Sequence, residues 1–176
     1  MNTMLINLSL FKAGWLAAVF SAAASLPGVG TAVIGIAALV HIVLSDRPQD
    51  ELRLLALAAA IGFAWESTLV ASGLVSYEAG MILPGFAPYW IVAMWVLFAT
   101  TINIGLRWLR NSTTIAVLTG AIGGPLSFLA GEKAGAVTFS DPQTALLVIG
   151  IGWALFLPLL VRYAVRNEAR AVPVAS

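Results

Sequence analysis

Long apolar segments separated by short polar breaks make up nearly the whole chain. Six of these segments approach the roughly 20 residues that a helix needs to cross a hydrocarbon core about 30 Å thick. They cover residues 10–26, 29–44, 52–72, 89–106, 113–131 and 143–165. The pattern therefore predicts an all-α fold, a polytopic bundle of six transmembrane helices that forms a single domain over residues 1–176.

The composition indicates that the apolar residues face lipid. Of the 176 residues, 60% are hydrophobic and only 10% are charged, whereas a soluble domain carries roughly 25% charged residues. Cysteine is absent and His41 is the single histidine, so we expect no metal and no cofactor. The net charge of +1 argues against a broad basic surface, and we expect no nucleic-acid partner.

The basic residues predict how the bundle is oriented. With six spans, eight of the 9 basic residues fall on the side of the N-terminus, and only Lys133 falls on the opposite side. Because positive charge favours the cytoplasmic side, we expect both termini in the cytoplasm and the protein in a bacterial inner (cytoplasmic) membrane. The eight residues are Lys12, Arg47, Arg53, Arg107, Arg110, Arg162, Arg166 and Arg170.

The first span has an alternative interpretation as a secretory signal peptide. Lys12 precedes an apolar stretch, and the small residues at positions 22–25 resemble a cleavage site. Residues 1–11, however, carry no charged side chain, whereas the leading region of a signal peptide normally carries the positive charge. We therefore favour a membrane-spanning helix.

Glu66 is the most informative polar residue, because it lies within an otherwise apolar span. Counted from residue 52 at 1.5 Å per residue, it lies about 21 Å along the helix. An acidic side chain at such a depth costs about 2.5–3.5 kcal/mol on insertion scales and usually faces the bundle interior or a wet cavity. Glu66 is therefore either a functional carboxyl group or a protonated acid that makes one interhelical hydrogen bond.

The fifth span offers a wall for this carboxyl group. Ser127, counted from the start of its own span, reaches the same height of about 21 Å, and the glycines of segment 123–127 allow close backbone approach. Pro125 lacks an N–H and frees a carbonyl group one turn earlier. A pocket between Glu66 and this segment is one prediction, and plain helix packing through small residues is the other. Lys133, at the outer end, either bends toward Glu66 or contacts headgroups. The candidate ligand- or proton-binding residues are Glu66, Trp65, Pro125, Ser127 and Lys133.

A second polar group lies in the cytoplasmic half of the predicted bundle. Thr100 and Asn103 lie near the end of the fourth span, and His41 has a similar depth in the second span. A hydrogen bond between Asn103 and His41 would satisfy both side chains, and such interhelical bonds are routine at about 0.6–2 kcal/mol each. We therefore expect a structural role for this group.

Three stretches resemble a known family. They cover residues 83–90, 94–103 and 123–131, and they accompany the acid that follows Gly62. Over most of its length the chain is similar to the small bacterial integral membrane proteins of domain-of-unknown-function family 2878. The resemblance implies the membrane topology but no settled activity. Where the family pattern has a tyrosine after Ser127 and often an aspartate in the third span, this chain has Phe128 and Glu66, which puts any role of a phenol hydroxyl in doubt.

The sequence favours binding over catalysis. The chain has no Gly-x-Ser-x-Gly elbow, no histidine-rich metal motif and no phosphate-binding glycine loop, so we predict no catalytic residue. The first hypothesis is a non-enzymatic protein that binds a lipid or another small apolar molecule. Similar proteins tend to be encoded near enzymes that modify membrane fatty acids, which makes membrane lipids and a lipid-modifying enzyme candidate partners. A second copy of the chain is a further candidate partner. The alternatives are a proton-coupled small-molecule transporter in which Glu66 titrates, and a lipid-modifying membrane enzyme.

Overall fold

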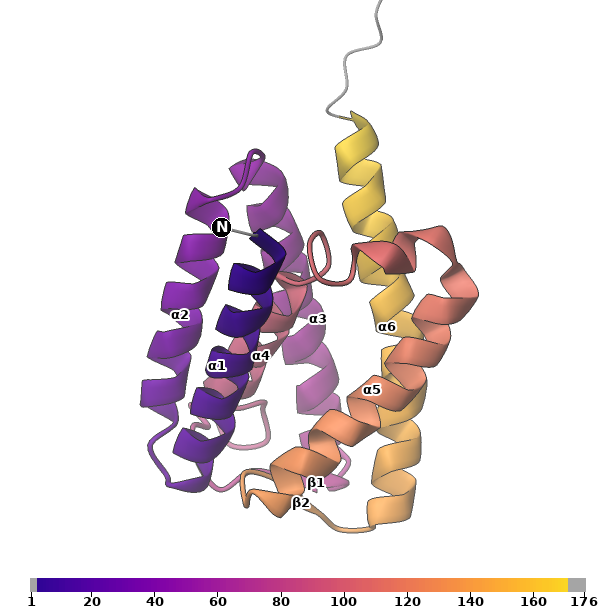
Figure 1. Ribbon diagram of the computed structural model, residues 1–176. Helices are drawn as coiled ribbons and strands as arrows, with labels where there is room; N and C mark the ends of the chain where they lie inside the picture. Colours follow the sequence, from indigo (N-terminus) through magenta and orange to yellow (C-terminus); the bar gives the residue numbers. More distant parts are fainter. Residues whose placement is uncertain (1–2, 171–176) are drawn as a thin grey trace, which may run out of the picture.

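Six α-helices form the part of the chain that the computed structural model describes, residues 3–170 (Figure 1). The helices are α1 (Thr3–Ala23), α2 (Pro27–Val43), α3 (Pro48–Ala71), α4 (Tyr89–Ala99), α5 (Thr113–Lys133) and α6 (Pro142–Arg170). A short 3-10 helix, η1 (Arg107–Asn111), lies between α4 and α5. The strands β1 (Val75–Ser76) and β2 (Thr138–Phe139) pair antiparallel, with Val75 opposite Phe139. Apart from this pair of two-residue strands, the regular secondary structure of the described residues is helical, so the predicted all-α fold is confirmed.

Local sequence signals explain where several helices begin. Pro27, Pro48 and Pro142 are the first residues of α2, α3 and α6. Proline suits this position, because its fixed φ matches a helix and its missing N–H has no intrahelical partner there. At the start of α5, the hydroxyl of Ser112 accepts a hydrogen bond from the backbone N–H of Ile115 at 3.3 Å, as an N-cap residue does.

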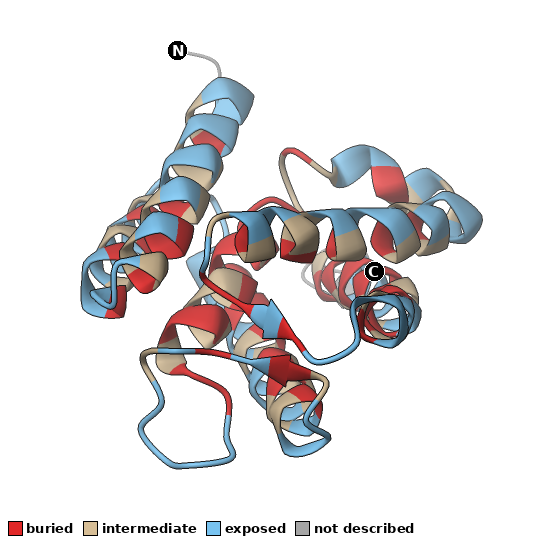
Figure 2. Cartoon of the chain, turned by 90° about the horizontal axis from the view of Figure 1, so that it is seen from below, coloured by how far each residue is buried: buried red, intermediate tan, exposed pale blue. Residues whose placement is uncertain are grey.

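Four of the described helices, α1, α3, α5 and α6, are long and apolar enough to span a membrane. Helix α2 has 17 residues and α4 only 11. At 1.5 Å per residue α4 extends about 17 Å, roughly half of a hydrocarbon core. Buried residues line the inner faces of the helices and exposed residues their outer faces (Figure 2). The outer faces carry apolar side chains such as Ile36, Ile122 and Leu155, each at least 60% exposed, as is expected of a bundle in lipid.

Helix α4 ends at Ala99 rather than at residue 106, where the predicted fourth span ends. The hydroxyls of Thr100 and Thr101 each donate to a carbonyl three residues earlier, at 2.7 Å, and such local bonds compete with the helical ladder. Asn7 of α1 donates to the carbonyl of Thr100 at 3.0 Å. Thr100 and Thr101 are both 3% exposed. Protein therefore surrounds this non-helical backbone, which is the condition for having it at membrane depth.

Helix α1 begins at Thr3 rather than at residue 10. Lys12 consequently lies about 14 Å along the helix at 1.5 Å per residue. The α2–α3 turn and η1, which hold Arg47 and Arg107, do lie at the same end of the bundle as the start of α1 and the end of α6 (Figure 1).

The helices pack mainly as neighbours in sequence. Helix α1 packs against α2, α3 against α4 and α5 against α6. The first pair approaches closely at Gly30, where a Cβ atom would lie 2.3 Å from the Cα of Ala18. Helices α1 and α5 belong to different pairs, and the space between them forms the cavity described next.

Candidate functional site

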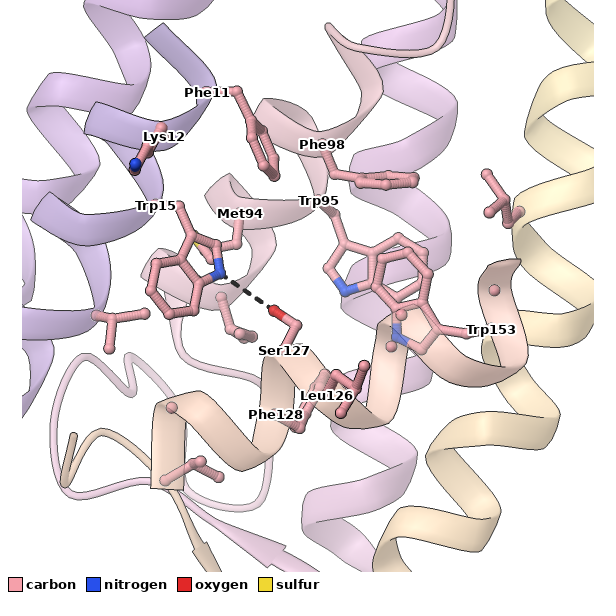
Figure 3. A pocket seen from close by; sticks show the side chains of 18 of the residues that line it. Phe11, Lys12, Trp15, Met94, Trp95, Phe98, Leu126, Ser127, Phe128 and Trp153 are labelled. Carbon is pink, nitrogen blue, oxygen red and sulfur yellow. Dashed lines mark hydrogen bonds between the residues drawn. The ribbon is translucent and has the colours of Figure 1, made fainter. Parts of the chain in front are cut away.

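A cavity of about 720 Å³ lies between α1, α4 and α5, and α6 contributes part of its wall. Trp15 of α1 and Ser127 of α5 meet across it, where the indole N–H donates to the hydroxyl oxygen at 3.1 Å (Figure 3). Most of the lining is apolar, and Lys12 is the one charged residue among the lining residues. The cavity thus combines a hydrophobic interior with a few polar groups, as small-molecule sites do.

The glycines of α5 determine how deep the cavity is. At Gly120 and Gly124 an added Cβ atom would lie 2.2 Å and 2.4 Å from atoms of Trp153, so these two positions let α6 approach. At Gly123, which also lines the cavity, an added Cβ atom would meet nothing within 4 Å. Gly123, Gly124 and Ser127 therefore line the cavity, and Gly123 is the position at which an added side chain would meet open space.

Aromatic side chains of α4 and α6 form the opposite wall. Trp95 stacks on Trp153 with ring centroids 4.5 Å apart, and Phe98 meets the same indole edge-on at 4.9 Å (Figure 3). Trp95 can lie there because α3 has Gly62 at the contact, where an added Cβ atom would come within 2.3 Å of the indole ring. The wall is consequently held by packing against α3 as well as α6.

Glu66 lies behind this aromatic wall and not in the cavity. Its side chain is 0% exposed, and its two carboxyl oxygens accept hydrogen bonds from Tyr77 Oη and Trp95 Nε1, both at 2.9 Å. Tyr77 and Trp95 do line the cavity. Burial, followed by the neighbouring Glu66, raises the pKa of Tyr77 above its usual range, so its hydroxyl stays protonated and able to donate. Glu66 thus positions two lining side chains, and Ser127 is not among its hydrogen-bond partners.

Three other predicted site residues lie outside the cavity lining. Trp65 packs between α3 and α6, with its ring 5.2 Å from that of Phe156. Pro125 faces α6, where its Cγ lies 3.3 Å from the position of an added Cβ atom on Gly150. Lys133 is exposed at the last residue of α5.

The second polar group is organised by a residue that the sequence analysis missed. Glu51, the fourth residue of α3, is 7% exposed. One of its oxygens lies 3.0 Å from His41 Nε2, and the other accepts from Asn103 Nδ2 at 2.7 Å. The direct bond expected between Asn103 and His41 is therefore replaced by a bridge through Glu51. Arg110 of η1 donates to Asn103 Oδ1, which extends this group toward α6 through its ion pair with Glu168.

The missed residues follow helical spacing that is readable in the sequence. On α3, Glu51 shares the buried face with Ala58, Gly62 and Glu66, at intervals of about one or two helical turns. On α1, the lining residues Leu8, Lys12, Trp15 and Val19 recur every three or four positions.

The cavity suits binding, and it lies within the part of the chain that the family comparison covers. No group of three or more His, Cys, Asp or Glu side chains that could hold a metal ion occurs within residues 3–170. No curated protein and no solved structure matches the chain. The profile described as "Protein of unknown function (DUF2878)" matches residues 4–159, a range that contains every residue lining the cavity. Because the match covers most of the chain, the protein belongs to the DUF2878 family.

Proposed function

We propose that this protein binds a lipid or another small apolar molecule in the cavity between α1, α4 and α5. The observation that carries the proposal is the cavity itself, about 720 Å³ in volume and lined mostly by apolar side chains. Small-molecule sites typically enclose about 300–1,000 Å³ and combine an apolar lining with a few polar groups. The protein binds this molecule without changing it chemically, and it works as a non-enzymatic accessory to a system that modifies membrane lipids.

The cavity opens toward the apolar outer surface. Leu16 of α1 and Leu126 of α5 line the cavity and are also 37% and 59% exposed. Two neighbours of Leu126 on the outer face of α5, Leu118 and Ile122, are 55% and 60% exposed. A molecule dissolved in the bilayer can therefore enter between α1 and α5 without crossing water.

The proposed environment is a bacterial inner membrane with both termini in the cytoplasm. Arg47, Arg107 and Arg110 belong to the α2–α3 turn and η1, at the end of the bundle where α1 begins and α6 ends (Figure 1). Lys133 ends α5. Positive charges favour the cytoplasmic side of a membrane protein, so the arginine-bearing end is assigned to that side.

Binding is favoured over transport or catalysis by the position of Glu66. Its carboxyl group is enclosed by Tyr77 and Trp95, and it does not line the cavity. A proton-coupled transporter needs its titrating group to meet the solvent or the cargo, and a lipid-modifying enzyme needs a reactive group beside its substrate.

The test compares two glycine substitutions by native mass spectrometry of the protein released from detergent. Gly123→Leu places a side chain in the cavity, because an added Cβ atom there meets nothing within 4 Å. Gly35→Leu on α2 is the matched control, since it is equally open but does not line the cavity. We expect the wild type and Gly35→Leu to carry the same co-purifying apolar adduct and Gly123→Leu to lose it. An adduct of unchanged occupancy in Gly123→Leu, or no adduct in the wild type, would overturn the proposal.

A further inference from the structure

We propose that the occupant of the cavity is an anionic amphiphile, an apolar chain that ends in a carboxylate or phosphate group, and that Lys12 pairs with this group at the edge of the cavity. This inference rests on the proposed function and names the chemical class of the ligand. Lipid tails are as apolar as leucine, so moving a chain from the bilayer into an apolar cavity gains little. The polar groups of the cavity therefore decide which membrane molecule is selected.

Two of the polar groups that remain available, on Trp153 and Ser127, are hydrogen-bond donors. Trp153 lines the cavity, and its buried indole N–H has no hydrogen-bond partner among the described residues. The hydroxyl oxygen of Ser127 accepts from Trp15, which leaves the Ser127 hydrogen able to donate. No aspartate or glutamate lines the cavity. A ligand that offers oxygen acceptors would match this set, whereas a hydrocarbon or a cation would leave it unpaired.

The other polar side chains of the aromatic wall are already satisfied. Tyr77 and Trp95 donate to Glu66 at 2.9 Å, and Trp90 donates to the carbonyl of Ala79 at 3.1 Å. Trp153 thus differs from Tyr77, Trp90 and Trp95 in that its N–H group has no acceptor among the described residues. A buried donor without a partner is costly, and an oxygen of the occupant would remove that cost.

Lys12 supplies the charge complementarity. It lies well inside an apolar helix that is long enough to span a membrane, where ammonium groups are rare and usually paired or functional. No ion pair of Lys12 is found among the described residues, and it shares its helix face with the lining residues Leu8 and Trp15. An anionic headgroup at the edge of the cavity would provide the counter-charge that the protein itself lacks there.

The experiment measures competition among probes that share one hexadecyl chain and differ in headgroup. The protein is placed in nanodiscs of a zwitterionic lipid, and a brominated hexadecanoate quenches the fluorescence of the lining tryptophans. Hexadecanoate, hexadecyl phosphate, hexadecanol and hexadecyltrimethylammonium then compete with it. We expect the two anions to bind at least about ten-fold more tightly than the alcohol, and the cation to bind most weakly. A ten-fold ratio corresponds to about 1.4 kcal/mol. The ratio between the two anions shows whether a carboxylate or a phosphate is preferred.

Two variants and one control assign the selection to its residues. Lys12→Met keeps a long apolar side chain and should reduce the preference for anions over the alcohol to near unity, and Lys12→Arg should retain it. Arg53→Met removes an exposed positive charge and should change nothing.

The outcomes separate this inference from the proposed function. Equal binding of all four probes would overturn the inference and leave the proposed function intact. Absence of binding by every probe would overturn both. A preference for anions that persists in Lys12→Met would show that the charge selection does not come from Lys12, and would overturn its assignment.

Discussion

Replacing Glu66 by leucine removes the acceptor that two buried donors share. Trp95 is held by its contact with Gly62 and by stacking on Trp153, so its N–H cannot turn toward another acceptor. Tyr77 belongs to a connecting segment and can adjust. A stranded buried donor costs about 1–3 kcal/mol, and interhelical hydrogen bonds in membranes average about 0.6 kcal/mol with a maximum near 1.7. We expect Glu66→Leu to destabilise the fold by about 2–3 kcal/mol, one stranded donor plus one lost bond.

The assay is unfolding by SDS in mixed micelles, followed by near-ultraviolet circular dichroism, which reports the packing of the tryptophans. Glu66→Gln should cost less, about 1 kcal/mol, because its amide oxygen can still accept from Trp95 while its N–H group donates to the hydroxyl of Tyr77. Combining Glu66→Leu with Tyr77→Phe should cost less than the sum of the two changes, since they remove one shared bond. The exposed Glu78→Leu is the control and should be neutral. An unchanged midpoint for Glu66→Leu, or strict additivity in the double variant, would refute this reasoning.

Three further predictions concern other contacts of the same bundle. Gly62→Ala places a Cβ atom 2.3 Å from the ring of Trp95 and should destabilise the fold by about 1–3 kcal/mol, so an unchanged SDS midpoint would contradict the packing. Glu51→Leu strands its partners, the buried His41 and the half-buried Asn103, and should cost about 1–3 kcal/mol, whereas Asp50→Leu loses only a surface ion pair worth about 0–1 kcal/mol. The raised pKa of Tyr77 means that the fold favours the neutral phenol. Its contribution to stability is present below the ordinary tyrosine pKa of about 10 and is lost as the pH rises through the higher folded value. In an absorbance titration Tyr77→Phe should therefore leave the first phenol ionisations unchanged, and loss of a phenol that titrates near pH 10 would contradict this.

The sequence predicted the helices, but it did not predict which face of each helix points toward which neighbour. Apolar segments and proline-rich breaks predicted the all-α bundle, and the glycines of segment 123–127 indicated the region that lines the cavity. Counting 1.5 Å per residue gave Glu66 and Ser127 the same height. Height does not give the direction in which a side chain points around the helix axis. Glu66 points to Trp95 on α4, and Ser127 points to Trp15 on α1.

Two other differences arose where local chemistry outweighs the average hydropathy of a segment. Residues 100–106 are apolar enough to extend a span, but the hydroxyls of Thr100 and Thr101 bond to their own backbone and end α4. The segment before residue 10 is also apolar, so α1 starts at Thr3 rather than at residue 10. The partner of Glu66 on the connecting segment, Tyr77, required the tertiary structure, because no periodic pattern links a loop residue to a helix face.

The short pairing of β1 with β2 limits the routes by which a molecule could enter the cavity. It ties the α3–α4 connection to the α5–α6 connection, and the residues beside it, Tyr77 and Val137, are 5% exposed and line the cavity. The strands thus cover the cavity at this end of the bundle, whereas its side between α1 and α5 stays open. Exchange of the proposed occupant would then be lateral, through the flank between α1 and α5.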